Sequence, residues 1–88
     1  MALEFFTGVV VMSKLDKSGD VVHGFGFILP DGVDPDADDA WIWFGAKTTN
    51  DTMLAKGERV KFALASNPSK IGKMAASVVR PESEGMLK

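Results

Sequence analysis

The stretch His23–Ile28, with the sequence HGFGFI, carries the most fold information in this chain of 88 residues. Successive side chains of a β-strand point to opposite faces of the sheet. Phe25 and Phe27 therefore share one face of a predicted strand, and the glycines between and before them leave the other face bare. The stretch is followed by Pro-Asp-Gly, a strong turn signal. It thus predicts a strand that presents two aromatic rings on one side and then ends.

The stretch Ala40–Phe44 (AWIWF) repeats this arrangement. Trp41 and Trp43 share one face of a second predicted strand, while Ile42 takes the other. If the two strands are neighbours, their rings lie side by side. We refer to these four residues as the aromatic face: Phe25, Phe27, Trp41 and Trp43.

The remaining periodicity and turn signals predict an all-β domain over residues 1–80 and a flexible tail over residues 81–88. Ser13–Asp20 has the composition of a turn, Gly8 is a candidate bend or bulge, and Gly45–Lys56 has room for at most one helical turn. Five antiparallel strands without a long amphipathic helix favour a small closed barrel, because closure removes the sheet edges. The predicted strands are Leu3–Met12, Val21–Leu29, Ala40–Phe44, Arg59–Ala65 and Gly72–Val79.

Composition narrows the function classes. With 45% hydrophobic and 25% charged residues the chain fits one small soluble domain, and no cysteine is present for disulfides, thiol catalysis or zinc–thiolate sites. The net charge is −2, but residues 41–88 hold eight basic against four acidic residues, which permits a locally basic face. No nucleophile with a partner base is recognisable, so we expect a non-enzymatic protein without metal or cofactor. Without a secretory or membrane-spanning segment, we expect a cytoplasmic location.

Two interpretations of the aromatic face remain open from periodicity alone. Aromatic rings at period two most often form the core. Alternatively, the rings face water and stack on unpaired bases. Other apolar residues could fill the interior of a small barrel, and four additional large rings would strain its volume. These interior candidates are Val9, Val11, Ile28, Ile42, Val60, Phe62, Leu64 and Val78.

Several motifs together resemble a cold-shock domain over about residues 7–80. The matching segments are Thr7–Val10, His23–Ile28 with Pro30–Gly32, Asp38–Phe44 and Leu54–Phe62. The two nucleic-acid-binding motifs of the family correspond to Gly24–Ile28 and Ala40–Phe44. The resemblance implies a five-stranded antiparallel barrel of the oligonucleotide/oligosaccharide-binding (OB) fold. It also implies that the aromatic face stacks bases of single-stranded RNA or DNA with loose sequence preference, as in an RNA chaperone or cold-shock regulator.

The resemblance also assigns roles to individual residues. Phe44 joins the aromatic face in stacking bases, Met12 adds an apolar edge, and His23 stands where the family has a basic residue. Asp39 matches a family position that can hydrogen-bond a base edge. Independently of the resemblance, Lys14 is the first candidate to hold a phosphate, because it directly follows the first predicted strand. Further candidate phosphate partners are Lys47, Lys61, Lys70 and Lys73.

The chain departs from the family pattern in ways that leave alternatives open. Val11–Ser13 replaces a basic residue and two aromatic residues, residues 49–53 lack the usual aromatic side chain, and the Leu15–Val22 loop is long. With the acidic residues near Asp39, these departures predict weaker binding than is typical of the family. An alternative function is a degenerate domain whose aromatic face contacts another protein. An RNA-recognition motif shares a Gly-aromatic-Gly-aromatic run but needs two helices, which the pattern does not predict.

Overall fold

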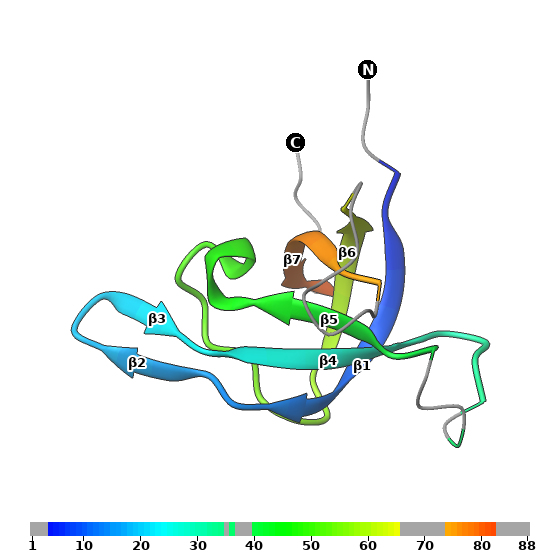
Figure 1. Cartoon of the computed structure of the whole chain (residues 1–88), viewed down its shortest axis with the longest axis horizontal. Helices are drawn as coiled ribbons and strands as arrows, with labels where there is room; N and C mark the ends of the chain where they lie inside the picture. Colours follow the sequence, from blue (N-terminus) through cyan, green and yellow to red (C-terminus); the bar gives the residue numbers. More distant parts are fainter. Residues whose placement is uncertain (1–3, 35, 37–39, 66–73, 83–88) are drawn as a thin grey trace.

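The computed structural model describes residues 4–34, 36, 40–65 and 74–82, and their regular structure is mostly β-strand (Figure 1). The predicted all-β class is therefore confirmed. The one named helix in these residues is the 3₁₀ helix η2 (Ala46–Thr49), as the space for a single helical turn predicted. The strands are β1 (Phe6–Ser13), β2 (Asp16–Ser18), β3 (Val21–His23), β4 (Phe25–Pro30), β5 (Ile42–Gly45), β6 (Arg59–Leu64) and β7 (Ala76–Pro81).

Five of these strands form one antiparallel sheet in the order β5-β4-β1-β6-β7. β1 is the central strand of this sheet. Its residues Phe6–Val9 pair with β6, and its residues Gly8–Ser13 pair with β4. Figure 1 shows β1 bending between these pairings, so that β4 and β5 cross the direction of β6. A parallel bridge between Trp43 and Ala75 connects β5 to the chain just before β7. The sheet is thus curled into a half-barrel.

The segment expected to be only a turn contains a short hairpin. β2 pairs with β3 across a turn in which Gly19 has a φ of 62°, and the hairpin extends beyond the end of the main sheet (Figure 1). The single strand predicted over Val21–Leu29 is divided at Gly24, which has a φ of 106°. A Cβ atom at Gly24 would collide with the carbonyl oxygen of Lys14. Only glycine fits this junction, because both the conformation and the space exclude a side chain.

The core is built from all five long strands, but β1 contributes the opposite face from the one predicted. Val10 is fully buried, while Val9 and Val11 are half-buried. The register of β1 against β4 shifts between Val10 and Met12, which makes Val11 an extra residue in a bulge. The alternative of a bulge at Gly8 is wrong, because Gly8 pairs in register with both neighbouring strands.

The other interior predictions hold in part. Val60, Phe62, Ile28 and Ile42 are in the core with Phe44 and Leu54, but Leu64 is exposed. A second register shift, between Ala63 and Leu64, breaks the alternation of β6. On β7 the buried valine is Val79 rather than Val78.

The C-terminal boundary lies later than predicted. Pro81 is the last residue of β7 and pairs with Val60, and Glu82 forms an ion pair with Arg59 at 3.0 Å. These two residues therefore belong to the domain rather than to a tail. Residues 83–88 lie outside the described part, as do the first residues, 72–73, of the last predicted strand. Within the described residues, no helix has the length and apolar character needed to cross a membrane.

Candidate nucleic-acid interface

Strand register aligns three predicted site residues in one row. Phe27 of β4 pairs with Met12 of β1 on one side and with Trp43 of β5 on the other. Residues directly opposite each other in antiparallel strands project from the same face of the sheet. Met12, Phe27 and Trp43 therefore form a cross-strand row on the face turned away from the core.

The four rings of the aromatic face make one continuous cluster. Phe25 stacks against Trp43 with ring centroids 6.5 Å apart and planes 18° from parallel. Phe25 also meets Phe27 edge to face at 6.2 Å, and Phe27 contacts Trp41 at 6.0 Å. These separations are in the range of favourable aromatic pairs. The adjacency that the sequence pattern predicted is thus present.

Exposure differs within the aromatic face. Phe25 is 37% exposed and both tryptophans are half-buried, whereas Phe27 is only 8% exposed. The rings are therefore neither fully in the core nor fully in solvent. Phe27 mainly supports the rings beside it, and the open aromatic surface belongs to Phe25, Trp41 and Trp43.

Phe44 requires a correction. The family resemblance implies that it stacks bases, but its side chain is fully buried in the core cluster. It points away from Trp43, its neighbour in β5, as the alternation of a strand demands. Its ring fills the space over Gly26, where a Cβ atom would lie 2.6 Å from Cζ of Phe44. Phe44 therefore stabilises the sheet and is not accessible to a base.

A glycine shapes the most exposed ring pair. Gly45 lies opposite Phe25 in the register of β4 and β5. A Cβ atom on Gly45 would lie 2.9 Å from Cη2 of Trp43, so the indole occupies the space above this residue. The absence of a side chain here allows the Trp43 indole to extend along β5 over Gly45 and stack on Phe25. Sequence reasoning did not identify Gly45 as a site residue, since its role depends on a tertiary contact.

The predicted polar site residues are distributed unevenly. The Lys14 backbone amide donates a hydrogen bond to the Phe25 carbonyl oxygen at 2.8 Å, which places this exposed lysine beside the aromatic face. His23 is exposed on β3, opposite Asp16. Lys61 lies on β6, which β1 separates from β4. Asp39, Lys70 and Lys73 lie outside the described residues.

A groove of about 660 Å³ adjoins Trp43, and we call it the hairpin groove. Its walls come from Val21–Gly24, from Trp43 and Gly45 of β5, from Ala46–Thr48 of η2, and from Asp51. The Val22 backbone amide approaches Oδ1 of Asp51 at 3.4 Å, which links the hairpin to the segment after η2. The sequence held no signal for this groove, because the hairpin itself was expected to be a turn.

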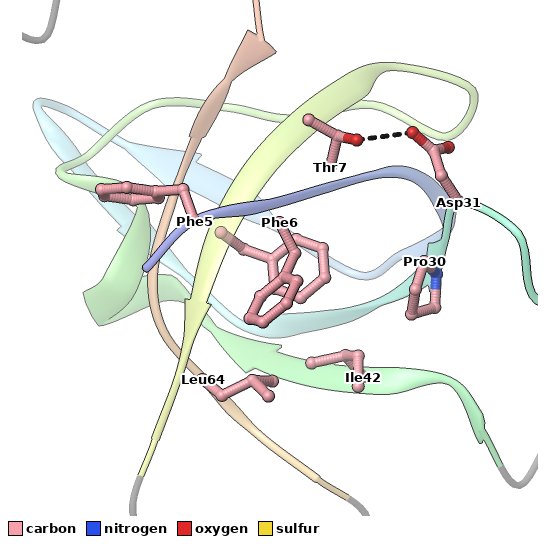
Figure 2. Close-up of a pocket in the computed structure, with 8 residues that line it drawn as sticks. Phe5, Phe6, Thr7, Pro30, Asp31, Ile42 and Leu64 are labelled. Atoms are coloured by element: carbon pink, nitrogen blue, oxygen red, sulfur yellow. Dashed lines mark hydrogen bonds between the residues drawn. The ribbon is translucent and has the colours of Figure 1, made fainter. Parts of the chain in front are cut away.

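A second groove of about 380 Å³ lies near the start of β1 (Figure 2). Figure 2 shows Phe6, Ile42 and Leu64 around it, with Asp31 at one end. The Asp31 carboxylate accepts a hydrogen bond from Oγ1 of Thr7 at 2.6 Å and two from Arg59 at 2.7 Å. These bonds, from Arg59 first and then Thr7, lower the pKa of Asp31 from 3.8 to about 2. The lining of this groove has apolar walls and one carboxylate, and it includes no lysine or arginine that would attract a phosphate.

Comparison of this chain with protein-family models, with curated proteins and with solved structures gave no match. Among the described residues, no group of three His, Cys, Asp or Glu side chains is placed to hold a metal ion.

Proposed function

We propose that this chain is a cold-shock-type module of the OB fold that binds single-stranded RNA or DNA by stacking bases on its aromatic face. The observation that carries the proposal is the stacked pair of Phe25 and Trp43, which is open to solvent on the outer side of β4 and β5. Every base has two apolar ring faces, so exposed parallel rings bind bases with little regard to sequence.

The fold supports this proposal. In OB folds the second and third barrel strands form the oligonucleotide-binding face. Here β4 and β5 correspond to those strands if the short hairpin is counted as an extension of the loop before β4. The strand order β5-β4-β1-β6-β7, with the bridge from Trp43 to Ala75, is compatible with such a partly open barrel. Binding of this kind requires no catalytic residue and favours unpaired nucleic acid by mass action.

The test is a tryptophan fluorescence titration with oligo(dT) and oligo(U) of seven nucleotides at two salt concentrations. We expect saturable quenching that weakens with salt, with a slope of about −0.7 for each phosphate neutralised. Phe25→Ala removes one stacking surface worth about 1–3 kcal/mol, which corresponds to roughly 5- to 150-fold weaker binding.

Phe5→Ala is the matched control, because Phe5 is 38% exposed but lines the groove near the start of β1. It should leave the affinity unchanged, and circular dichroism should show that both variants fold. Equal effects of the two substitutions would contradict the proposal. Absence of quenching up to about 0.1 mM, well above the micromolar end of nonspecific binding, would contradict it too and direct attention to a protein partner for the aromatic face.

A further inference from the structure

The hairpin groove shares a wall with the aromatic face. Trp43 stacks on Phe25 at 6.5 Å and also lines the groove, whereas Phe25 is not among the lining residues. Figure 1 shows β3 and η2 near the same end of β5. A chain of nucleotides that crosses the Phe25–Trp43 pair toward this end therefore arrives at the groove.

We propose that the hairpin groove binds one nucleotide of the same single strand whose neighbouring bases stack on the aromatic face. This inference rests on the proposed function and assigns it an additional binding site, which the β2–β3 hairpin creates. Without the hairpin, the walls formed by Val21 and Val22 would be missing. The groove would then be only a shallow edge of the sheet.

The lining matches the chemistry of a nucleotide. The indole of Trp43 and the exposed side chain of Val21 provide apolar surface for a base, and the volume of about 660 Å³ falls within the usual range of small-ligand sites. Oγ1 of Thr48 donates a hydrogen bond to the Gly45 carbonyl oxygen at 2.7 Å, and its lone pairs remain able to accept a bond from a base N–H. A base has apolar faces and a polar edge, so it suits a groove with apolar walls and a few polar groups.

The charged residues of the groove indicate how a bound nucleotide would be oriented. Lys47 is exposed in the last turn of η2 and can pair with a phosphate, and His23 adds a ring-nitrogen donor on the wall that β3 forms. The Asp51 carboxylate approaches the Val22 amide, so it is turned toward the hairpin backbone. We therefore expect the phosphate to lie on the Lys47 side and the base to lie against Trp43.

The walls of the groove are held in place by backbone and side-chain hydrogen bonds. The Ala46 amide donates to the Gly24 carbonyl oxygen at 2.9 Å, which joins η2 to the junction between β3 and β4. Nη1 of Arg80 donates to the Thr48 carbonyl oxygen at 2.7 Å. A groove whose walls are already ordered loses less entropy when a ligand binds.

Backbone-amide chemical-shift mapping with oligo(dT) of seven nucleotides tests the inference. If it is correct, amides of the groove (Val21, Lys47, Thr48) shift together with amides of the aromatic face (Met12, Phe27). If only the aromatic-face amides shift, the inference is overturned while the proposed function stands. If neither set shifts, the proposed function fails and the inference fails with it.

Lys47→Ala provides a second measurement, with Lys56→Ala as the matched control. Both remove one exposed lysine, but Lys56 does not line the groove. We expect Lys47→Ala to weaken binding roughly two- to fivefold and to reduce the salt slope by about 0.7, as the loss of one phosphate contact requires. Lys56→Ala should change neither quantity. The inference would be overturned if the two lysine variants showed the same affinity and salt slope while Phe25→Ala still weakened binding.

Discussion

At the scale of single residues, the lack of a side chain at Gly45 leaves room for the Trp43 indole. Gly45 has ordinary extended dihedral angles, φ −100° and ψ 162°, so its backbone does not require glycine. What requires glycine is the space, which the end of the Trp43 ring occupies. Gly26 is different, because a Cβ atom there would lie 2.6 Å from the Met12 carbonyl oxygen, part of the adjacent strand.

We therefore predict opposite outcomes for alanine at these two glycines. Gly45→Ala should fold with nearly unchanged stability, because the mobile end of a side chain can yield. It should displace the indole from Phe25 and weaken oligonucleotide binding by up to about tenfold, part of a stacking contact worth about 1–3 kcal/mol. Gly26→Ala should lower the free energy of unfolding by about 1–3 kcal/mol, since backbone cannot yield as easily.

Urea denaturation and ring-current shifts of the Phe25 protons measure these two effects. Equal losses of stability in the two variants would show that the contact at Gly45 is as rigid as the contact at Gly26. Unchanged Phe25 shifts in Gly45→Ala would show that Trp43 does not depend on the bare glycine.

At the scale of elements, the Arg80 side chain links β7 to η2. The Arg80 guanidinium donates a hydrogen bond through Nη1 to the Thr48 carbonyl oxygen, one of the terminal carbonyls that a helix leaves without an internal partner. Within η2 itself, Oγ1 of buried Thr49 donates to the Ala46 carbonyl oxygen at 2.8 Å. The position of η2, and with it one wall of the hairpin groove, therefore depends on β7.

Arg80→Met should release this element while retaining most of the packing of the side chain. A hydrogen bond from a charged donor contributes about 1.5–3 kcal/mol, so we expect the free energy of unfolding to fall by about that amount. Amide hydrogen exchange should accelerate at Thr49 and Asn50, and not in β4, which Arg80 does not contact through this bond. Uniform acceleration throughout the sheet would indicate a global effect instead.

At the scale of the whole molecule, a cluster of charges joins the ends of four strands. Arg59, at the start of β6, pairs with Asp31 after β4 at 2.7 Å and with Glu82 after β7 at 3.0 Å. Thr7 of β1 donates to the same Asp31 carboxylate. The paired carboxylate resists protonation, because the Arg59 and Thr7 hydrogen bonds lower its pKa to about 2.

This depressed pKa predicts a pH dependence of stability. The stabilisation is fully present above the ordinary pKa of 3.8 and is lost as the pH falls toward about 2, because the unfolded chain then binds the proton more readily. Thermal unfolding between pH 5 and 2 should show a shallower decline for Asp31→Asn than for the native protein. Asp16→Asn is the control on the exposed hairpin, and it should follow the native curve. Parallel curves for all three proteins would contradict the role of the cluster.

Much of the aromatic face could be predicted from the sequence. Alternation with a period of two is a local property of an extended chain, so it placed Phe25 with Phe27 and Trp41 with Trp43 before any partner strand was known. The same rule places Phe44 on the opposite face of the strand from Trp43. The family resemblance nevertheless led to the wrong prediction that Phe44 stacks bases. Turn residues such as Pro30-Asp31-Gly32 located the strand ends for a similar reason, since they act on the local backbone.

The sequence alone thus determined the all-β class and which rings share a face, because both follow from local backbone geometry. Only the tertiary structure decided which apolar face of β1 is buried, where the bulge at Val11 falls, and that Leu64 is exposed. It also decided the hairpin groove, which needs β3, β5 and η2 together. These features depend on register between strands distant in the chain, and a shift of one residue reverses the face that every later side chain occupies.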